Sequence, residues 1–240
     1  MTDHDDNVLF APDPSVAAVY EAVAAALAEH DKATAVRTAV EAVTSGGVEI
    51  PALYRDVLTR ILADTGSAWQ TGRTAIWEEH LASATVRTIV EILYPGVLKA
   101  KAAVPATGRT VLLACPPEEG HDLGLRMVAD RFDMAGWTTY FLGPDTPVAE
   151  IADAARRLGA DAVVMSSSTH FHRLAVRHAV DALKKELPGT DIWVGGPAFL
   201  GAATGWLPEE MVNLDELLGE RAGRGTEGAD QAPEADEEEA

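Results

Sequence analysis

Apolar residues recur every three or four positions from residue 14 to about residue 95, which is the period of an amphipathic helix. Polar or helix-breaking residues interrupt this pattern near His30, at Gly46-Gly47, at Gly72 and at Pro95-Gly96. Four amphipathic helices with short connections predict a helical bundle over residues 14–98. The expected helices cover residues 14–30, 31–45, 51–69 and 73–94.

The pattern changes after residue 108, where short apolar runs alternate with helical segments that begin at Leu123, Pro147 and Phe171. Such alternation predicts a doubly wound, flavodoxin-like (Rossmann-like) parallel sheet with helices on both faces and strand order 2-1-3-4-5. The fold class is therefore expected to be α plus α/β. The expected strands cover residues 110–115, 137–142, 162–166 and 191–194.

Domain boundaries follow from these changes in pattern. A linker is expected at residues 99–108, and the α/β domain at residues 109–218. Residues 1–13 should form a flexible N-terminus. Residues 219–240 should form a disordered acidic tail, because eight acidic and two basic residues lie in 220–240 with little apolar content.

Charge and cysteine content exclude several classes of protein. The formal net charge is −19 and no Lys/Arg stripe is present, which argues against direct nucleic-acid binding. No apolar run approaches the ~18 residues of a membrane span, and the N-terminus lacks a signal peptide's basic start, so a cytoplasmic protein without membrane contact is expected. The single cysteine, Cys115, excludes an internal disulfide framework and is expected to be buried.

Three polar or glycine-containing loops follow the first, third and fourth expected strands: residues 119–124, residues 166–169 and Gly195-Gly196. These strands are neighbours in the predicted order, so their loops should line one crevice at the carboxyl edge of the sheet. The first loop lacks Gly-x-Gly-x-x-Gly, and the chain lacks Gly-x-Ser-x-Gly, which disfavours a dinucleotide site and a hydrolase nucleophile. One histidine with an orienting carboxylate suits a bulky ligand whose metal takes one axial donor.

The spacing of these loops is Glu119-x-His121-x-x-Gly124, 41 residues, Ser166-x-Ser168, 26 residues, then Gly195-Gly196. It resembles the pattern of the cobalamin-binding domain of methionine synthase and its relatives. In that family Asp stands where this chain has Glu119, and Leu where it has Ser168. The resemblance covers about 110 residues of the chain.

This resemblance implies that His121 is the lower axial cobalt ligand and that Glu119 accepts a hydrogen bond from its other ring nitrogen. The cofactor's own nucleotide base would then leave the metal and insert between the first and third strands. The resemblance places a further group of small and polar residues against the cofactor: Asp122, Gly124, Ser166, Ser168, Thr169, Gly195 and Gly196.

A second pattern lies in the helical half, where nine residues separate Trp69 from Glu79-His80. Taken singly, Trp69 fits core packing, Glu79 fits a solvated helix face, and His80 fits helix packing three positions after Trp77. As a set they resemble the CarH-type light sensors, in which a tryptophan and a Glu-His pair shield an adenosyl group. The resemblance implies that Trp69 packs on that group and that Glu79 accepts hydrogen bonds from its ribose.

One position departs from the CarH-type pattern. A histidine follows the tryptophan in that family and can ligate cobalt after photolysis, whereas this chain has Gln70. A photoproduct with two histidine ligands is therefore not implied. No DNA-binding domain is expected either, so the resemblance implies a light sensor that is not an enzyme, binds adenosylcobalamin or another cobalamin form, and signals through homo-oligomer formation or an effector protein.

Two alternatives remain open. The first is a corrinoid protein that carries methyl groups for a methyltransferase. The second is a photocobilin-like sensor that holds biliverdin beside cobalamin, with a chromophore site after the serine loop. The residues for that second site, which also fit the polar start of an ordinary helix, are His170, Phe171, His172, Arg173 and Arg177.

Overall fold

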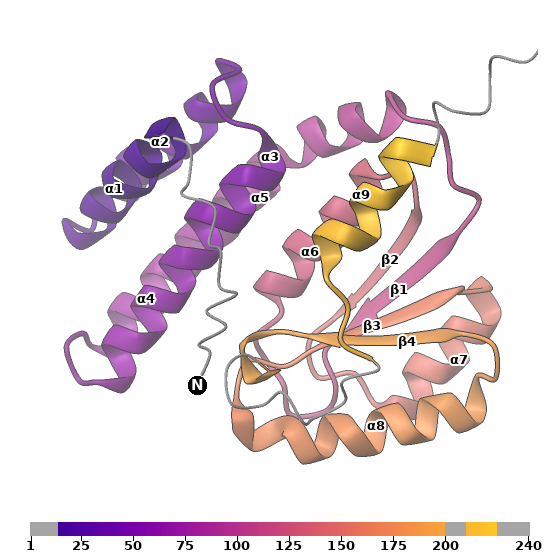
Figure 1. The fold of residues 1–240 in the computed structure, drawn as a ribbon. Helices are drawn as coiled ribbons and strands as arrows, with labels where there is room; N and C mark the ends of the chain where they lie inside the picture. Colours follow the sequence, from indigo (N-terminus) through magenta and orange to yellow (C-terminus); the bar gives the residue numbers. More distant parts are fainter. Residues whose placement is uncertain (1–13, 200–209, 225–240) are drawn as a thin grey trace, which may run out of the picture. The chain divides into compact units, whose positions relative to one another are not determined.

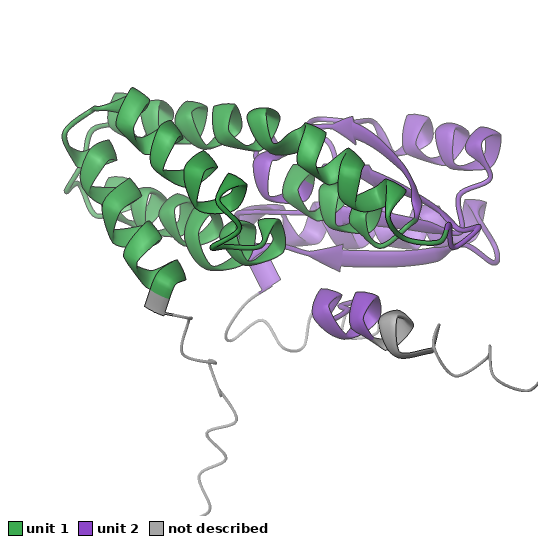
Figure 2. Ribbon diagram, turned by 90° about the horizontal axis from the view of Figure 1, so that it is seen from above, with its two compact units in different colours: residues 1–105, 126–136 green, residues 106–125, 137–240 purple. Residues whose placement is uncertain are grey.

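The structure, a computed structural model, describes residues 14–199 and 210–224 (Figure 1). The N-terminus expected at residues 1–13 and residues 225–240 of the expected acidic tail lie outside that range. The chain divides into two compact units (Figure 2): residues up to 105 together with 126–136, and residues 106–125 together with those from 137 onward. The two units are described separately below.

The first unit is helical and contains the expected bundle helices. They are α1 (Pro14–Ala28), α2 (Lys32–Thr44), a continuous rod of α3 (Ile50–Ala52), the π-helical segment η1 (Leu53–Leu58) and α4 (Thr59–Gln70), and finally α5 (Ile76–Ala102). Local hydrogen bonds explain where two of them begin. The Asp31 side chain accepts from the Thr34 N–H at 2.9 Å at the start of α2, and Glu78 accepts from the Ala75 N–H at 2.7 Å at the start of α5.

Helix α5 does not end at Pro95-Gly96, as the sequence pattern predicted, but continues to Ala102. The expected linker therefore begins within this helix. Proline removes one backbone hydrogen bond, yet Leu93 and Val97 on either side of it are buried, so tertiary packing holds the helix together. At Gly96 a Cβ would lie 3.0 Å from Ile50 Cδ1, so glycine here permits close packing of α3 against α5.

The expectation that no apolar run could span a membrane requires correction for α5. This helix is long and apolar enough by length and composition alone, although core helices of soluble proteins pass the same test. In the apolar 18-residue stretch of α5 that meets this test, 39% is buried within the protein. The buried residues recur at helical spacing, as in a core helix: Ala82, Val86, Ile89, Val90, Leu93 and Val97.

The second unit contains a parallel sheet of β1 (Thr110–Ala114), β2 (Thr138–Gly143), β3 (Ala162–Ser166) and β4 (Asp191–Gly195). The order β2-β1-β3-β4 confirms the first four positions of the predicted order. At the position of the expected fifth strand, the described residues show an isolated parallel bridge between Val194 and Met211.

The remaining helices are α6 (Leu123–Met134), α7 (Val148–Leu158), η2 (His170–His172), α8 (Arg173–Glu186), η3 (Pro197–Phe199) and α9 (Leu214–Arg224). Helix α9 continues through residues 219–224, where a disordered tail was expected. The core of the sheet unit joins strand residues such as Leu112 and Met165 to Ile151 of α7 and to Val180 of α8. This packing leaves the loops at the carboxyl ends of the strands to form a site.

Candidate functional site

The loop after β1 is fixed by backbone contacts to the loop after β2. Pro116-Pro117 ends the strand, and the Cys115 carbonyl accepts from the Thr146 N–H at 3.0 Å. The Asp145 side chain accepts from the Glu118 N–H at 2.9 Å, and Glu118 adopts a left-handed conformation with φ of 67°. These contacts hold the backbone of the next residue, Glu119, in one place.

Glu119 is fully buried and joins the loop after β1 to the loop after β3. Its Oε1 accepts from His121 Nδ1 at 2.5 Å. Its Oε2 accepts from Ser167 Oγ at 2.9 Å, from the Ser168 N–H at 2.8 Å and from His172 Nδ1 at 3.2 Å. The structure therefore brings the loops after β1 and β3 together, and a single carboxylate connects them.

The charge of Glu119 is stabilised by these donors. Burial alone would raise the pKa of the Glu119 carboxyl, but the hydrogen bonds from His121, Ser168 and His172 outweigh it and hold the pKa well below its ordinary range. The carboxylate is thus ionised and accepts a hydrogen bond from the Nδ1–H of His121, whose side chain is 64% exposed. This tautomer directs the Nε2 lone pair outward, as a metal-ligating imidazole requires.

A prediction follows for the pH dependence of stability. The folded-state pKa of Glu119 lies below the unfolded value of about 4.3, so its stabilisation is present above that value and is lost as the pH falls through the folded pKa. Glu119→Gln should lower the free energy of unfolding at pH 7 by about 1–3 kcal/mol, because it disturbs buried hydrogen bonds. Urea titrations from pH 3 to 7 should show this difference shrinking with acidity. Glu118→Gln, at the exposed neighbouring position, is the control. If the difference in unfolding free energy between wild type and Glu119→Gln does not change with pH, the lowered pKa of Glu119 is contradicted.

The glycines and hydroxyls at the carboxyl edge fit a bulky ligand. Gly196 has φ of +102°, and a Cβ there would lie 2.4 Å from the Ser167 carbonyl oxygen, so only glycine permits this approach. Around Gly195 and Gly124 a Cβ would meet nothing within 4 Å, which leaves open space beside the backbone. The Thr169 hydroxyl is buried and finds no hydrogen-bond partner in the part of the chain that the structure describes.

Cys115 lies at the end of β1 and is fully buried, as predicted. Burial, together with the nearby carboxylates of Glu119 and Asp122, raises the pKa of the Cys115 thiol to about 12. The thiol is therefore protonated and is a poor nucleophile or metal ligand. Asp122 itself is buried, with 7% of its surface exposed.

The residues proposed from the sequence for biliverdin divide into two groups. His172 contacts Glu119, and the Arg173 Nε–H donates to the Ala198 carbonyl, so both have structural partners. His170 stacks on Phe171 with ring centroids 4.0 Å apart, and Phe171 is 80% exposed. Arg177 is also exposed. The contact of His172 with Glu119 was not foreseen from the sequence, since the two residues lie 53 positions apart.

The three helical site residues lie in the first unit. Trp69 lies in the last turn of α4 and is 45% exposed, so it does not take the core position that packing alone would favour. Glu79 lies in the first turn of α5, where its carboxylate accepts from Ser83 Oγ at 2.7 Å and lies 3.6 Å from His80 Nε2. Trp77 packs on His30 instead of forming part of this group.

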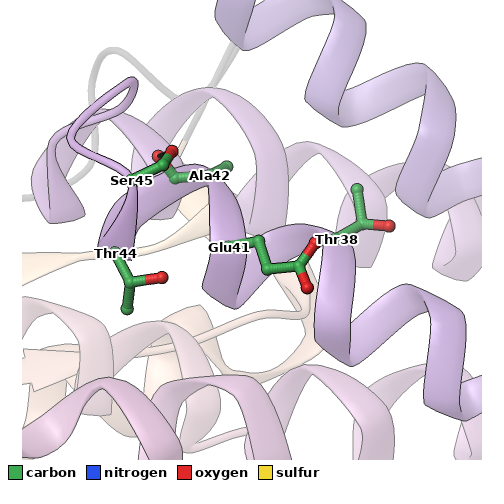
Figure 3. Close-up of a pocket in the computed structure, with 5 residues that line it drawn as sticks. All are labelled: Thr38, Glu41, Ala42, Thr44 and Ser45. Atoms are coloured by element: carbon green, nitrogen blue, oxygen red, sulfur yellow. Dashed lines mark hydrogen bonds between the residues drawn. The ribbon is translucent and has the colours of Figure 1, made fainter.

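Two surface depressions of the helical unit contain none of the residues expected to bind the cofactor. One is a depression on α2 lined by Thr38, Glu41, Ala42, Thr44 and Ser45 (Figure 3). Another lies between α2 and α5 and includes Val36, Val40 and Ile92. Across residues 14–199 and 210–224, no three His, Cys, Asp or Glu side chains are placed to hold a metal ion.

Two family models match the chain. Residues 109–220 match a B12 binding domain, and residues 19–94 match a second model that is also described as a B12 binding domain. The chain therefore contains two B12 binding domains, a helical one followed by an α/β one.

Two curated relatives come from Myxococcus xanthus. The HTH-type transcriptional repressor CarH is 32% identical over 147 residues, which cover 60% of this chain and 47% of that protein. The HTH-type transcriptional repressor CarA is 34% identical over 94 residues, which cover 39% of this chain and 31% of that protein. The chain thus matches less than half the length of each relative.

Among solved structures, the monomethylamine corrinoid protein of Methanosarcina barkeri has a TM-score of 0.71 and 16% identity. The match covers 88% of this chain and 99% of that protein. At this identity the likeness shows a shared fold: a helical region followed by a Rossmann-like parallel sheet.

Proposed function

We propose that this protein is a light sensor that binds adenosylcobalamin through His121. The observation that carries the cobalamin part is the buried, ionised Glu119, which accepts a hydrogen bond from the Nδ1–H of His121 and so directs Nε2 outward. Glu119 raises the basicity of the imidazole by taking this hydrogen bond, and so strengthens it as an axial ligand. The open backbone at Gly195, the close approach at Gly196 and the unpartnered Thr169 hydroxyl fit the cofactor's nucleotide tail.

The light-sensing part of the proposal rests on the helical residues. Bound adenosylcobalamin supplies a cobalt–carbon bond that visible light can cleave. Trp69, which is half-exposed, would cover the adenosyl group, and Glu79 would accept hydrogen bonds from its ribose, with His80 beside it. The similarity to the repressor CarH supports this use of the fold. Gln70 supplies no imidazole, so a second histidine ligand after illumination is not expected at that position.

Signalling would then pass through contacts between proteins. We propose a cytoplasmic, non-enzymatic sensor that changes its homo-oligomeric state or its contact with an effector protein, without touching DNA itself. The net charge of −19 supports the last point.

The rival function is a corrinoid methyl carrier, and its support is the fold shared with the monomethylamine corrinoid protein. Preference for the upper ligand separates the two. Protein loaded in the dark should bind adenosylcobalamin more tightly than methylcobalamin, because Trp69 and Glu79 have partners only in the adenosyl complex. Green light should then bleach the adenosyl spectrum. Equal or tighter binding of methylcobalamin, measured by equilibrium dialysis, would favour the carrier.

Biliverdin binding remains a second proposal, supported by the exposed stack of His170 on Phe171. Binding would be non-covalent, since Cys115 is buried and its pKa is raised. Because His172 already contacts Glu119, His170 is the imidazole better placed to serve a bilin. A red-shifted band that co-elutes with the cobalamin-loaded protein and is lost in His170→Ala would support this site, and the absence of any retained band would reject it.

A further inference from the structure

Helix α6 starts in the loop that carries His121 and continues into the helical unit. Its first residue, Leu123, lies two positions after His121. Residues 126–136, which form most of the helix and the turn after it, belong to the helical unit. The chain itself therefore links the His121 loop to the helices. The contacts that hold α6 within the helical unit determine how stiff this link is.

The central contact is a buried hydrogen bond. The Tyr54 hydroxyl donates to Asp130 Oδ2 at 2.9 Å, with Tyr54 1% exposed and Asp130 0% exposed. Arg126, one turn earlier on α6, pairs with the other carboxylate oxygen of Asp130, and its guanidinium lies 4.9 Å from the centre of the Tyr94 ring. Burial raises the pKa of Asp130, while Arg126 and Tyr54 oppose that shift. Loss of either partner would leave a buried polar group incompletely satisfied, which is costly.

Tyr54 is itself held tightly. It lies in the π-helical segment η1, where its carbonyl accepts both the Thr59 N–H and, at 2.8 Å, the Thr59 hydroxyl. Single π-helical turns inside α-helices are often found at functional sites. A π-helical turn contains one residue more than an α-helical turn. In a regular α-helix the Tyr54 side chain would therefore point in a different direction around the helix axis.

The C-terminal end of α6 is also held by contacts within the helical unit. Lys101 of α5 donates to Asp133 at 2.6 Å. After the helix, Gly136 has φ of +80°, and a Cβ there would lie 2.4 Å from the Pro105 carbonyl oxygen. Contacts with Lys101 and Pro105 constrain the C-terminal end of the helix. The hydrogen bonds of Glu119 constrain the loop that precedes its N-terminal end. The Tyr54–Asp130 bond holds the middle of the helix within the helical unit.

We propose that Tyr54 and Asp130 are positioning residues that couple the His121 loop to the helical unit. A helix held at a buried hydrogen bond moves as a body, so a shift of the loop at its start is passed to η1, and a shift of η1 is passed to the loop. The coupling is a property of the fold and needs no cofactor. Its use, to carry a change at cobalt into the helices, rests on the function proposed above.

The test uses Tyr54→Phe in the full chain, with Tyr20→Phe as the matched control. Tyr20 also donates to an aspartate, Asp64 at 2.6 Å, but this pair is exposed. Amide hydrogen exchange of residues 119–125 in the cofactor-free protein should be at least tenfold faster in Tyr54→Phe, a factor equivalent to about 1.4 kcal/mol. Tyr20→Phe should leave it unchanged.

Two further variants separate positioning from simple destabilisation. Asp130→Asn keeps an oxygen that accepts from Tyr54 and should preserve most of the slow exchange at residues 119–125, whereas Asp130→Ala should not. If Tyr54→Phe fails to fold, this pair provides the comparison. Faster exchange confined to residues 50–60 and 126–134, with residues 119–125 unaffected, would overturn the coupling.

The cobalamin-loaded protein provides the final readout. In the Co(II) form of protein labelled with ¹⁵N-histidine, ¹⁵N hyperfine splitting in the electron paramagnetic resonance spectrum reports histidine ligation, and its intensity should fall in Tyr54→Phe but not in Tyr20→Phe. Unchanged ligation would mean that the coupling does not reach cobalt. If His121→Ala also left this signal unaltered, the proposed function would fail, while the exchange result from the cofactor-free protein would still decide the coupling.

Discussion

Replacing His121 with Ala is expected to change the absorption spectrum of bound cobalamin and to weaken its binding by at least about tenfold. The reason is that Glu119 accepts a hydrogen bond from the Nδ1–H of His121 at 2.5 Å, which leaves Nε2 as the nitrogen for the proposed axial bond. Titration of cofactor-free protein with cobalamin in the dark, followed by absorbance, measures both quantities.

His170→Ala is the matched control for this experiment, since His170 lies at the same carboxyl edge, is exposed, and stacks on Phe171 instead of contacting Glu119. Its spectrum should equal that of the wild type. His172→Ala should give an intermediate result, because it removes one donor to Glu119 without removing the ligand. An unaltered spectrum in His121→Ala would remove the basis of the proposed site.

Illumination of the adenosylcobalamin complex is expected to speed hydrogen exchange across the helical region, residues 14–95. Loss of the adenosyl group would deprive Trp69 and Glu79 of their partner, and with it the contacts that favour the dark arrangement. Trp69→Ala should weaken dark binding roughly three- to tenfold, as expected for loss of an aromatic contact, and should reduce the exchange difference between dark and light.

Trp77→Ala provides the comparison for Trp69→Ala. Trp77 is 55% exposed on the adjacent helix, and its ring packs on His30 with centroids 5.0 Å apart. This variant should keep both the dark affinity and the light response of the wild type. If light bleaches the adenosyl spectrum while exchange in residues 14–95 stays constant, the protein binds a photolabile cofactor without sensing light through its helices.

The contacts around Glu119 change how the candidate site is understood. A carboxylate that only oriented His121 would need one hydrogen bond, yet Glu119 also accepts from Ser167, Ser168 and His172. The loop after β3 therefore closes on the same residue that orients the proposed ligand. Any displacement of that loop when a ligand enters the crevice would change the hydrogen bonds of Glu119, and so the basicity of His121.

Much of the fold and part of the site were predictable from the sequence, because they depend on local patterns. Apolar periodicity predicted the helices and strands, and a motif of fixed spacing predicted that Glu119 and His121 would meet at the carboxyl edge. Both predictions rest on short-range chemistry: side-chain period, capping, and the parallel arrangement that brings strand ends together.

Tertiary structure alone decided three other features. Helix α5 passes through Pro95 because the burial of its flanking residues outweighs one lost backbone hydrogen bond. His172 contacts Glu119 across 53 positions, a pairing that strand register and loop shape determine and that no local pattern encodes. Tyr54 and Asp130 form their buried bond 76 positions apart because a π-helical turn directs the phenol toward α6. Side-chain types and spacings can be read directly from the sequence. Contacts between distant segments depend on how the whole chain packs, and no local pattern specifies them.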